Sequence, residues 1–382
     1  MSRKYQSKKC LRIFDLDQKR SLGNITQSEF KRLVKLNLLN NISFEPEKVS
    51  LHDPGSHNEI ISMEVAPYPH KLLLTLTKNS SFAIFNINSH PLGYKIKLNK
   101  HIRADNILSF TPPNSIHWFW DCSMISIGIR YSIQFWDVEV GEEIETIRLR
   151  SSILNHVIAA KEHTVHDYVA VSGNEGNVFI LDIRVGNIVL TSHAVERNPI
   201  RALHWHPNND LQYATGNDNG NIFLWDTRFQ KKALLKFCGN ESFNQVSSHE
   251  QPVAGLRFYN NGTSIVSIDN EGTVKSWEVS SGRIRLGYYD QVQFCNFNQH
   301  TFYKEYQFST TDNLKDDIAF MPSAEGLCTF DLNTGKQLSY SKALRRSIIC
   351  TSYDPQTLRV YGSMNNIIRS WAPLQPTPDD LT

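Results

Sequence analysis

The sequence is poor in cysteine, and its cysteines are not arranged for metal or redox chemistry. Six cysteines in 382 residues stand singly, without a Cys-x-x-Cys pair, and structural zinc sites and dithiol redox sites need such pairs. The 14 histidines do not group at ligand spacings either. His204 and His206 flank Trp205 on a predicted strand, where a surface or packing role is expected rather than metal binding. We therefore expect no metal and no other cofactor.

Neither an excess of charge nor a long apolar run is present. The formal net charge is +2, whereas nucleic-acid-binding domains usually show a clustered excess of Lys and Arg. No apolar run reaches the roughly 18 to 20 residues of a membrane span, and the opening Met1-Ser2-Arg3-Lys4 lacks the apolar stretch of a signal peptide. These absences predict a soluble intracellular protein that makes no direct sequence-specific contact with nucleic acid and none with a membrane.

Local catalytic motifs are also missing. The sequence contains no Gly-x-Ser-x-Gly, no Walker loop and no His-Glu-x-x-His, which mark common hydrolases, nucleotide-binding enzymes and metalloproteases. Since one fold can host many activities, this absence alone decides little, but it favours a non-catalytic protein.

What the sequence does contain is a repeated unit, seen most clearly in residues 201–228. This stretch alternates apolar and polar residues in three short runs, separated by turn residues, and it ends in Trp225-Asp226. Period-two alternation broken by turns predicts half-buried antiparallel strands. Three short strands cannot bury their apolar face alone, so the unit requires neighbours of the same kind.

Seven such units are marked by an aromatic residue or leucine followed by a small, usually acidic, residue. Successive units are 41 to 53 residues apart, against roughly 40 to 45 for a four-stranded propeller blade of the WD type. The seven pairs are Phe85-Asn86, Trp136-Asp137, Leu181-Asp182, Trp225-Asp226, Trp277-Glu278, Phe330-Asp331 and Trp371-Ala372. The chain resembles a WD-repeat protein, and we predict an all-β fold, a seven-bladed WD-repeat β-propeller with a short N-terminal helical arm.

A glycine four residues after the acidic position is a second, independent mark of the repeat. It occurs in four of the seven units, where the turn between two antiparallel strands needs a positive φ. These glycines are Gly141, Gly186, Gly282 and Gly335.

The N-terminal region is predicted to differ from the repeats. Residues 1–20 have no hydrophobic period and are interpreted as a mobile basic segment, and residues 21–41 as an amphipathic helical arm. Thr26 and Glu29 have the spacing of a capping box, and an apolar stripe at helical spacing follows. The stripe consists of Phe30, Leu33, Val34 and Leu38. The arm either braces the propeller or is offered to another protein, and the sequence leaves both interpretations open.

The propeller is assigned to residues 42–373, and we expect it to be closed by its N-terminal strand. Prolines follow Trp371, and proline cannot donate to a strand ladder, so the last blade lacks a fourth strand of its own. A predicted strand at residues 42–52 is expected to complete that blade and to cover both open sheet edges. Residues 374–382 form a Pro-rich acidic tail.

Two consecutive units carry an arginine two residues after the acid. These pairs are Asp182 with Arg184 and Asp226 with Arg228, and we predict that both arginines lie on the same side of the ring. An arginine at such a turn is either a solvated residue with little effect on stability or an anchor for a partner's carbonyls or carboxylates.

These features together resemble the substrate receptors that dock on the damaged-DNA-binding adaptor of cullin-4 RING ubiquitin ligases. More narrowly, the chain is similar to the Cockayne syndrome group A protein family, as a divergent, fungal-type member. Besides the helix and the Asp-x-Arg pairs, the similarity rests on Leu203-His204-Trp205 through Trp225-Asp226-Thr227-Arg228, on His249 after a polar linker, on Ser276-Trp277 with Ser281-Gly282, and on Trp371-Ala372-Pro373 with Pro378-Asp379-Asp380.

The resemblance implies a non-catalytic receptor that works in the nucleus as a monomer within a hetero-complex. Some of its loops would recognise the stalled RNA polymerase II elongation complex and its Swi2/Snf2-type ATPase during transcription-coupled nucleotide excision repair. The residues implied in binding the adaptor are Asp182, Arg184, Asp226, Arg228, Phe30, Leu33 and Val34. The alternatives are a chromatin- or histone-binding WD-repeat scaffold and a propeller enzyme.

Overall fold

The computed structural model describes most of the chain. The described residues are 13–42, 47–51, 59–90, 93–103, 113–158, 167–193, 197–229, 231–238, 247–286, 289, 292, 305–311, 317–342 and 347–371. The predicted acidic tail, residues 374–382, lies outside them, as do residues 1–12 of the predicted basic segment.

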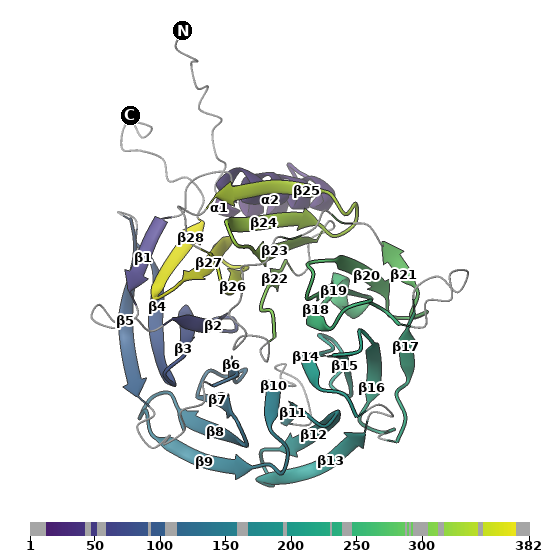
Figure 1. The fold of residues 1–382 in the computed structure, drawn as a ribbon. Helices are drawn as coiled ribbons and strands as arrows, with labels where there is room; N and C mark the ends of the chain where they lie inside the picture. Colours follow the sequence, from purple (N-terminus) through teal and green to yellow (C-terminus); the bar gives the residue numbers. More distant parts are fainter. Residues whose placement is uncertain are drawn as a thin grey trace.

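The described strands form seven four-stranded antiparallel sheets arranged around a common axis (Figure 1). In every sheet, the first member of one of the seven residue pairs recognised in the sequence lies in the third strand from the axis. This arrangement confirms the prediction of an all-β, seven-bladed propeller.

The blades follow one another along the chain, except that the last one borrows its outer strand. Blades 1 to 3 consist of β2 (Ile60–Val65), β3 (Leu72–Thr77), β4 (Ser81–His90) and β5 (Gly93–Arg103); β6 (Ser115–Trp118), β7 (Met124–Ile129), β8 (Ser132–Asp137) and β9 (Glu143–Arg148); and β10 (Ile153–Ile158), β11 (Tyr168–Gly173), β12 (Asn177–Asp182) and β13 (Asn187–His193). Blades 4 to 6 consist of β14 (Ile200–Trp205), β15 (Gln212–Asn217), β16 (Ile222–Asp226) and β17 (Leu235–Phe237); β18 (Val253–Tyr259), β19 (Ser264–Asp269), β20 (Val274–Glu278) and β21 (Ile284–Leu286), with a short 3-10 turn, η2 (Asn260–Gly262); and β22 (Ser309–Thr310), β23 (Ile318–Pro322), β24 (Gly326–Asp331) and β25 (Gln337–Lys342). Blade 7 consists of β26 (Thr351–Asp354), β27 (Arg359–Met364), β28 (Ile367–Trp371) and β1 (Glu47–Leu51).

Within each blade we call the strands a, b, c and d, from the axis outward. Because neighbouring strands are antiparallel, the turns from a to b and from c to d leave the sheet on one side, and the turn from b to c leaves it on the other. The blades repeat the same order, so one face of the ring carries all the a–b and c–d turns. We call this face the c–d face.

The ring is closed by β1, which lies beside β28 as strand d of blade 7. The two strands are antiparallel, with Glu47 opposite Ser370 and Leu51 opposite Ile367. The strand expected at residues 42–52 thus has the predicted place in the ring, but it begins at Glu47, because Ile42 is the last residue of α2. Since β28 is paired on both sides, the blade presents no open edge where the ring begins and ends.

Neighbouring blades pack face to face through their apolar side chains. One cluster joins Leu74 and Ile84 of blade 1 to Ile125 and Trp136 of blade 2. The same packing between blades 6 and 7 buries Trp371. Each sheet therefore buries against its neighbours the apolar surface that it cannot cover alone.

The turn glycines have the conformation that the sequence predicts. Gly141, Gly186, Gly282 and Gly335 have φ values of 80°, 64°, 68° and 73°. All four lie in c–d turns, where a side chain would be strained.

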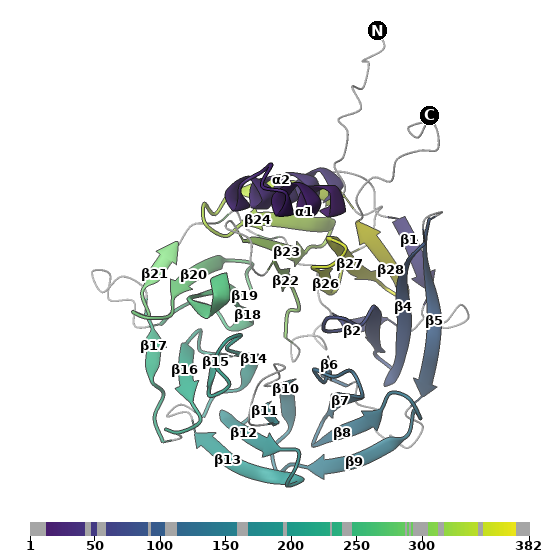
Figure 2. The ribbon, with the colours of Figure 1, turned by 180° about the vertical axis from the view of Figure 1, so that it is seen from behind.

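Two helices, α1 (Ile13–Ser21) and α2 (Gln27–Ile42), precede the propeller and lie over blade 6 in the view of Figure 2. Helix α1 differs from the expectation of a mobile segment up to residue 20, because Leu16 is buried against the second helix and the propeller. Helix α2 begins with the predicted capping box: the Thr26 N–H donates to Glu29 Oε2 at 3.0 Å, and the Glu29 N–H donates to Thr26 Oγ1 at 3.2 Å. Among the described residues, no helix is long and apolar enough to cross a membrane.

Candidate functional site

The strongest candidate site lies in the c–d turn of blade 4, where an arginine forms hydrogen bonds with the acid two residues before it. Arg228 Nε donates to Asp226 Oδ1 at 2.9 Å, and Arg228 Nη2 donates to Asp226 Oδ2 at 2.7 Å. The backbone N–H of Arg228 also donates to Asp226 Oδ1, at 2.9 Å. The carboxylate is buried at the end of β16, whereas 61% of the arginine side chain is exposed.

Blade 3 repeats this arrangement at the end of β12. Arg184 Nε and Nη2 donate to the two oxygens of Asp182 at 3.3 and 3.1 Å. The side chain of Arg184 is 53% exposed, and that of Asp182 is 8% exposed. Both arginines lie on the c–d face in adjacent blades, as the sequence predicts.

The two pairs, which we call the Asp-Arg forks, are preorganised. The hydrogen bonds from Arg184 and Arg228 lower the pKa of Asp182 and of Asp226, so both acids stay ionised and keep their arginines in place. Within the described residues, Nη1 of each guanidinium makes no hydrogen bond with the protein. Each fork therefore offers an oriented cation to a partner at little further cost in side-chain entropy.

An exposed apolar residue follows each fork, and the same position is apolar in blade 2. Val140, Val185 and Phe229 stand three residues after the acid in blades 2, 3 and 4, and each is at least 60% exposed. The sequence interpretation missed this row, although the shared offset in three consecutive units could have shown it. Exposed apolar side chains gathered beside oriented arginines are typical of protein-binding surfaces.

In blade 6, the acid at the end of strand c, which we call the rim acid in each blade, is paired differently. A lysine from α2 takes the place of the arginine. Position 333, two residues after Asp331, is an asparagine. Lys35 Nζ donates to Asp331 Oδ2 at 2.8 Å, and both side chains are largely buried. Helix α2 is therefore held against the c–d face by an ion pair at the position that the forks occupy in blades 3 and 4.

The apolar stripe of α2 faces inward and supports the brace interpretation of the helical arm. Val34 and Leu38 are buried together with Leu358 of the a–b turn in blade 7, and Phe30 and Leu33 are half-buried against the same cluster. Three residues that the sequence assigned to adaptor binding, Phe30, Leu33 and Val34, thus face α1 and the propeller. Among the side chains of this region that the structure describes, the exposed large apolar ones are Leu22, just after α1, and Leu36 of α2.

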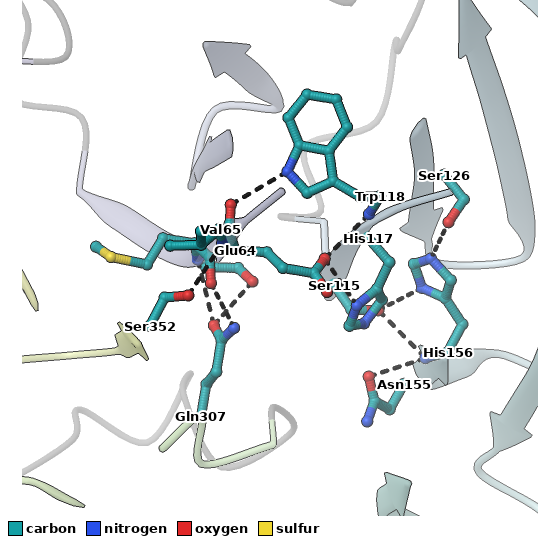
Figure 3. Close-up of polar contacts among 12 residues, drawn as sticks. Glu64, Val65, Ser115, His117, Trp118, Ser126, Asn155, His156, Gln307 and Ser352 are labelled. Atoms are coloured by element: carbon teal, nitrogen blue, oxygen red, sulfur yellow. Dashed lines mark hydrogen bonds and ion pairs between the residues drawn. The ribbon is translucent and has the colours of Figure 1, made fainter. Parts of the chain in front are cut away.

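A second polar region surrounds the axis, where the segment before β22 crosses between blades (Figure 3). Gln307 Nε2 donates to the Met63 carbonyl at 2.7 Å in blade 1, and the Thr351 N–H of blade 7 donates to the Gln307 carbonyl at 3.3 Å. One residue earlier, the Tyr306 N–H donates to the carbonyl of Ala254 in blade 5 at 2.8 Å. Residues 305–307 thus tie together strands a from opposite sides of the ring.

Glu305 is an acidic residue near the axis whose pKa is raised. Burial raises its pKa to about 7, while Arg257 and His117 act in the opposite direction. Its Oε2 accepts a hydrogen bond from Asn155 Nδ2 in blade 3. Its Oε1 is buried and has no hydrogen-bond partner among the described residues.

Blades 1 to 3 are joined near the axis by buried histidine contacts (Figure 3). His156 lies between Ser115 Oγ, at 2.5 Å from Nδ1, and Ser126 Oγ, at 2.8 Å from Nε2. Burial, and next the proximity of His117, lower the pKa of His156 well below its usual value, so the ring is neutral. His117 Nδ1 lies 3.2 Å from Glu64 Oε2. These contacts are structural links between neighbouring blades.

Blade 5 contains a serine, a histidine and an aspartate in the order of a catalytic triad, but they are buried. His249 Nδ1 lies 3.2 Å from Asp269 Oδ2, and His249 Nε2 lies 2.7 Å from Ser267 Oγ, which also accepts a hydrogen bond from Trp277 Nε1 at 2.8 Å. None of the four side chains is accessible, so no substrate can reach the hydroxyl. The network links the strands of the blade to the chain that leads into it.

The histidines near Trp205 pack between blades, which is one of the two roles expected for them. The rings of His204 and His206 lie 5.9 and 5.0 Å from that of Phe258 in blade 5. In the part of the chain that the structure describes, no group of three or more His, Cys, Asp or Glu residues could hold a metal ion.

Comparison with known proteins identifies the repeat. The family profile described as WD domain, G-beta repeat matches residues 186–226, which run from the c–d turn of blade 3 to the end of β16 in blade 4. Arg184 and Arg228 lie two residues outside this match, one at each end. The match shows that one unit of the seven-bladed propeller is a WD repeat.

The similar proteins found are generic WD-repeat proteins, and none of those named here is a Cockayne syndrome group A protein. The chain is 22% identical over 275 residues to the WD repeat-containing protein srw1 of Schizosaccharomyces pombe, covering 70% of this chain and 46% of that protein. It is 24% identical over 155 residues to the eukaryotic translation initiation factor 3 subunit I of Drosophila pseudoobscura pseudoobscura, covering 39% and 44%. It is 23% identical over 128 residues to the ribosome biogenesis protein WDR12 homolog of Ixodes scapularis, covering 33% and 29%. The chain thus spans less than half the length of these relatives.

Proposed function

We propose that this WD-repeat propeller is a non-catalytic receptor that binds a partner protein on its c–d face, with Arg184 and Arg228 as anchors. The observation that supports this function best is the pair of Asp-Arg forks, in which a buried acid holds an exposed arginine at the same turn of two adjacent blades. An isolated turn arginine would have to be ordered on binding, whereas these two are already oriented.

The anchors lie in surroundings that suit a protein partner. Val185 and Phe229 directly follow the arginines and are exposed, so a partner can bury apolar surface around the guanidinium groups. An arginine desolvated at the centre of an interface typically costs on the order of 2 kcal/mol or more when truncated, about thirtyfold in affinity. Nucleic acid would instead require a clustered excess of positive charge.

In its specific form, the proposal names the damaged-DNA-binding adaptor of a cullin-4-type ubiquitin ligase as the partner. This part rests on the resemblance to the Cockayne syndrome group A protein family. Helices α1 and α2 border the same face, so Leu22 and Leu36 are placed to add contacts, while Phe30, Leu33 and Val34 keep the helical pair seated. The receptor would act in the nucleus on the stalled RNA polymerase II complex and its Swi2/Snf2-type ATPase, in transcription-coupled repair.

The test is capture of the purified adaptor by the full chain and by the double variant Arg184→Ala with Arg228→Ala. We expect the variant to lose capture by about thirtyfold or more. The matched control is Arg150→Ala with Arg197→Ala, which removes two exposed arginines from the d–a connections on the opposite face and should bind normally. Circular dichroism must show that both variants are folded at the assay temperature.

Equal capture by the wild type and the folded fork variant would contradict the proposal. If the wild type itself fails to bind the adaptor but binds histones or nucleosomes, the chromatin scaffold becomes the better function.

A further inference from the structure

The c–d turns of blades 2, 3 and 4 differ sharply in charge. From Asp137 to Arg148, blade 2 carries five carboxylates against one arginine. From Asp182 to His193, blade 3 carries one acid and one arginine, which form the fork. The corresponding part of blade 4, residues 226–238, carries four basic residues against one acid. The rim therefore changes from acidic through neutral to basic across three adjacent blades.

The side chains that produce this gradient are exposed. Glu139, Glu142, Glu143 and Glu145 are exposed in blade 2, and Arg228, Lys231 and Lys232 are exposed in blade 4. At these positions the charges attract or repel a partner directly, because no part of the described chain covers them.

Apolar residues run along the same path. Besides Val140, Val185 and Phe229, strands d or the chain leading into them expose Ile144, Val189 and Leu234 in blades 2, 3 and 4. The equivalents of the first three are polar in blades 5 and 6, namely Ser281 and Thr334. The apolar row thus lies on the same three blades, 2 to 4, as the charge gradient.

The acidic and neutral parts of this path are in contact. A Cβ atom placed on Gly186, in the turn of blade 3, would lie 3.0 Å from Glu145 Oε1 of blade 2. Positive φ at Gly186 and the adjacent fork fix the shape of that turn. Blades 2 and 3 are therefore in direct contact along this path. We call the path along the c–d turns of blades 2, 3 and 4 the bipolar strip.

We propose that the bipolar strip binds a segment of a partner protein that is basic where it crosses blade 2, apolar over blade 3 and acidic where it crosses blade 4. Charge complementarity at both ends sets the register, and the apolar middle supplies the burial. A nucleic acid backbone is disfavoured, because the glutamates of blade 2 would repel its phosphates. The proposal deepens the proposed function, since it assumes that the same face is used for docking, but it concerns the chemistry of the bound segment and not the identity of the adaptor.

The test uses labelled synthetic peptides and fluorescence anisotropy at low salt. The first peptide has a block of lysines, an apolar middle and a block of glutamates; the second replaces the lysines by glutamates, and the third replaces the glutamates by lysines. We expect the wild-type chain to bind the first peptide about tenfold more tightly than the other two, with a preference that weakens as salt screens the exposed charges.

Charge reversal should change which peptide is preferred. In Glu142→Lys with Glu143→Lys, residues 137–148 of blade 2 carry three acids against three basic residues. Blade 2 becomes neutral while blade 4 stays basic, so the strip has a net positive charge and the all-acidic peptide should become the tightest ligand. In Lys231→Glu with Lys232→Glu the all-basic peptide should become the tightest. The control, Lys78→Glu with Glu175→Lys, reverses two exposed charges in b–c turns on the opposite face and should keep the wild-type order.

Similar binding of all three peptides by the wild type, or an unchanged order in the reversed variants, would overturn the inference. So would a wild-type dimer, seen by sedimentation, that either reversed variant abolishes, because the occupant would then be a second copy of the chain. Since the adaptor is absent from these assays, its failure to bind would count against the proposed function without touching this result.

Discussion

Blades 3 and 4 and blades 6 and 7 present the same face of the ring in opposite ways. In blade 6, the rim acid Asp331 is neutralised by Lys35 from a helix almost 300 residues earlier in the chain, and the helix covers the turn. In blades 3 and 4, the acids are neutralised by the arginines two residues away, and nothing in the described chain covers the turns. One part of the face is therefore occupied by the protein itself, and the other is left open.

This difference shows that a buried rim acid needs a paired cation but that the cation can come from two sources. Each of the three carboxylates is largely removed from water, and an unpaired charge in such a place is costly. In blades 3 and 4 an arginine two residues away pairs with the acid and leaves the surface open. In blade 6, Lys35 pairs with the acid, and the helix that carries this lysine covers the turn. In these three blades, an arginine two residues after the acid accompanies an open turn, and an asparagine accompanies a covered one.

The largest expected effect comes from deleting the N-terminal segment that covers blades 6 and 7. Deletion of residues 1–51 removes α1, α2 and β1, exposes the edge of β28 and uncovers Leu358. The loss should exceed the roughly 5 to 15 kcal/mol by which domains are stable, and the remaining chain should be insoluble. A soluble product that melts cooperatively at the full-length temperature would show that the cover is dispensable.

Single residues of α2 give a graded version of this test. Leu38→Ala empties a fully buried position and should cost about 2 to 4 kcal/mol of unfolding free energy. Leu36→Ala, on the exposed side of the same helix, is the matched control and should stay within about 0.5 kcal/mol. Chemical denaturation of both variants measures the difference, and equal losses would mean that the helix is not packed as described.

A pH titration separates the rim acids of both regions from the acid at the axis. Burial raises the pKa of Glu305 to about 7, so its stabilising contribution is complete below its unfolded pKa of about 4.3 and is lost as the pH rises through 7. The acids at the ends of these strands c have lowered pKa values. Arg184 and Arg228 lower the pKa of Asp182 and of Asp226. At Asp331 burial acts to raise the pKa, but the contacts with Lys35 and the backbone hydrogen bonds from Asn333 and Thr334 together lower it. Their contribution is instead lost as the pH falls below about 4.

The variant Glu305→Gln isolates the axial effect, because the amide cannot titrate but can still accept from Asn155. Between pH 5 and 8, the stability of the wild type relative to this variant should fall by on the order of 2 kcal/mol. Buried histidines such as His156 and His249, whose pKa values are lowered by burial, titrate in both proteins and cancel in the difference. Parallel stability curves for the two proteins would contradict the raised acidity at the axis.

Breaking the ion pair of the covered region should have a smaller effect. Lys35→Met leaves the carboxylate of Asp331 without its cation in a largely buried place and should cost about 1 to 2 kcal/mol. Adding Asp331→Asn should recover part of this loss, which a double-mutant cycle would measure. Additive losses would mean that the two residues do not depend on each other.

The smallest expected effect is loss of one fork in the open region. Arg228→Ala should lower the stability only slightly, because the backbone N–H of residue 228 still donates to Asp226. Arg184→Ala should cost somewhat less, since Asp182 is less deeply buried than Asp226. Thermal melts of the two single variants measure both losses, and two variants as stable as the wild type would mean that the forks are solvated turn residues after all.

The repeated architecture was predictable because each blade carries its own local marks. An aromatic residue or leucine in strand c and a glycine in the c–d turn meet requirements set within a few residues, namely burial of strand c and a positive φ. Closure by β1 was predictable for a similar reason, since the prolines after Trp371 leave strand c of blade 7 without a partner of its own.

The contacts that distinguish the two regions were less accessible to prediction. The sequence shows Arg184 and Arg228 near acids, but it does not show that those acids are buried, so the arginines looked nearly neutral for stability. Lys35 and Asp331 are far apart in the chain, and no periodicity links them. Helix α1 was missed because its buried residue, Leu16, gains its partners only from α2 and blade 7. In each case the missing information was tertiary burial.

The pairing of β1 with β28 joins two strands that the ribosome synthesises at widely separated times. Strand β1 is synthesised before any complete blade, and its partner follows about 300 residues later, which corresponds to about 15 to 60 s at usual rates of synthesis. During that time the six blades between them can form one after another, each against its predecessor. The backbone N–H and C=O groups of β1 that later pair with β28 have no partner there until β28 is made. A nascent chain released or stalled before residue 367 therefore carries β1 without its partner, and such unpaired strands are templates for aggregation.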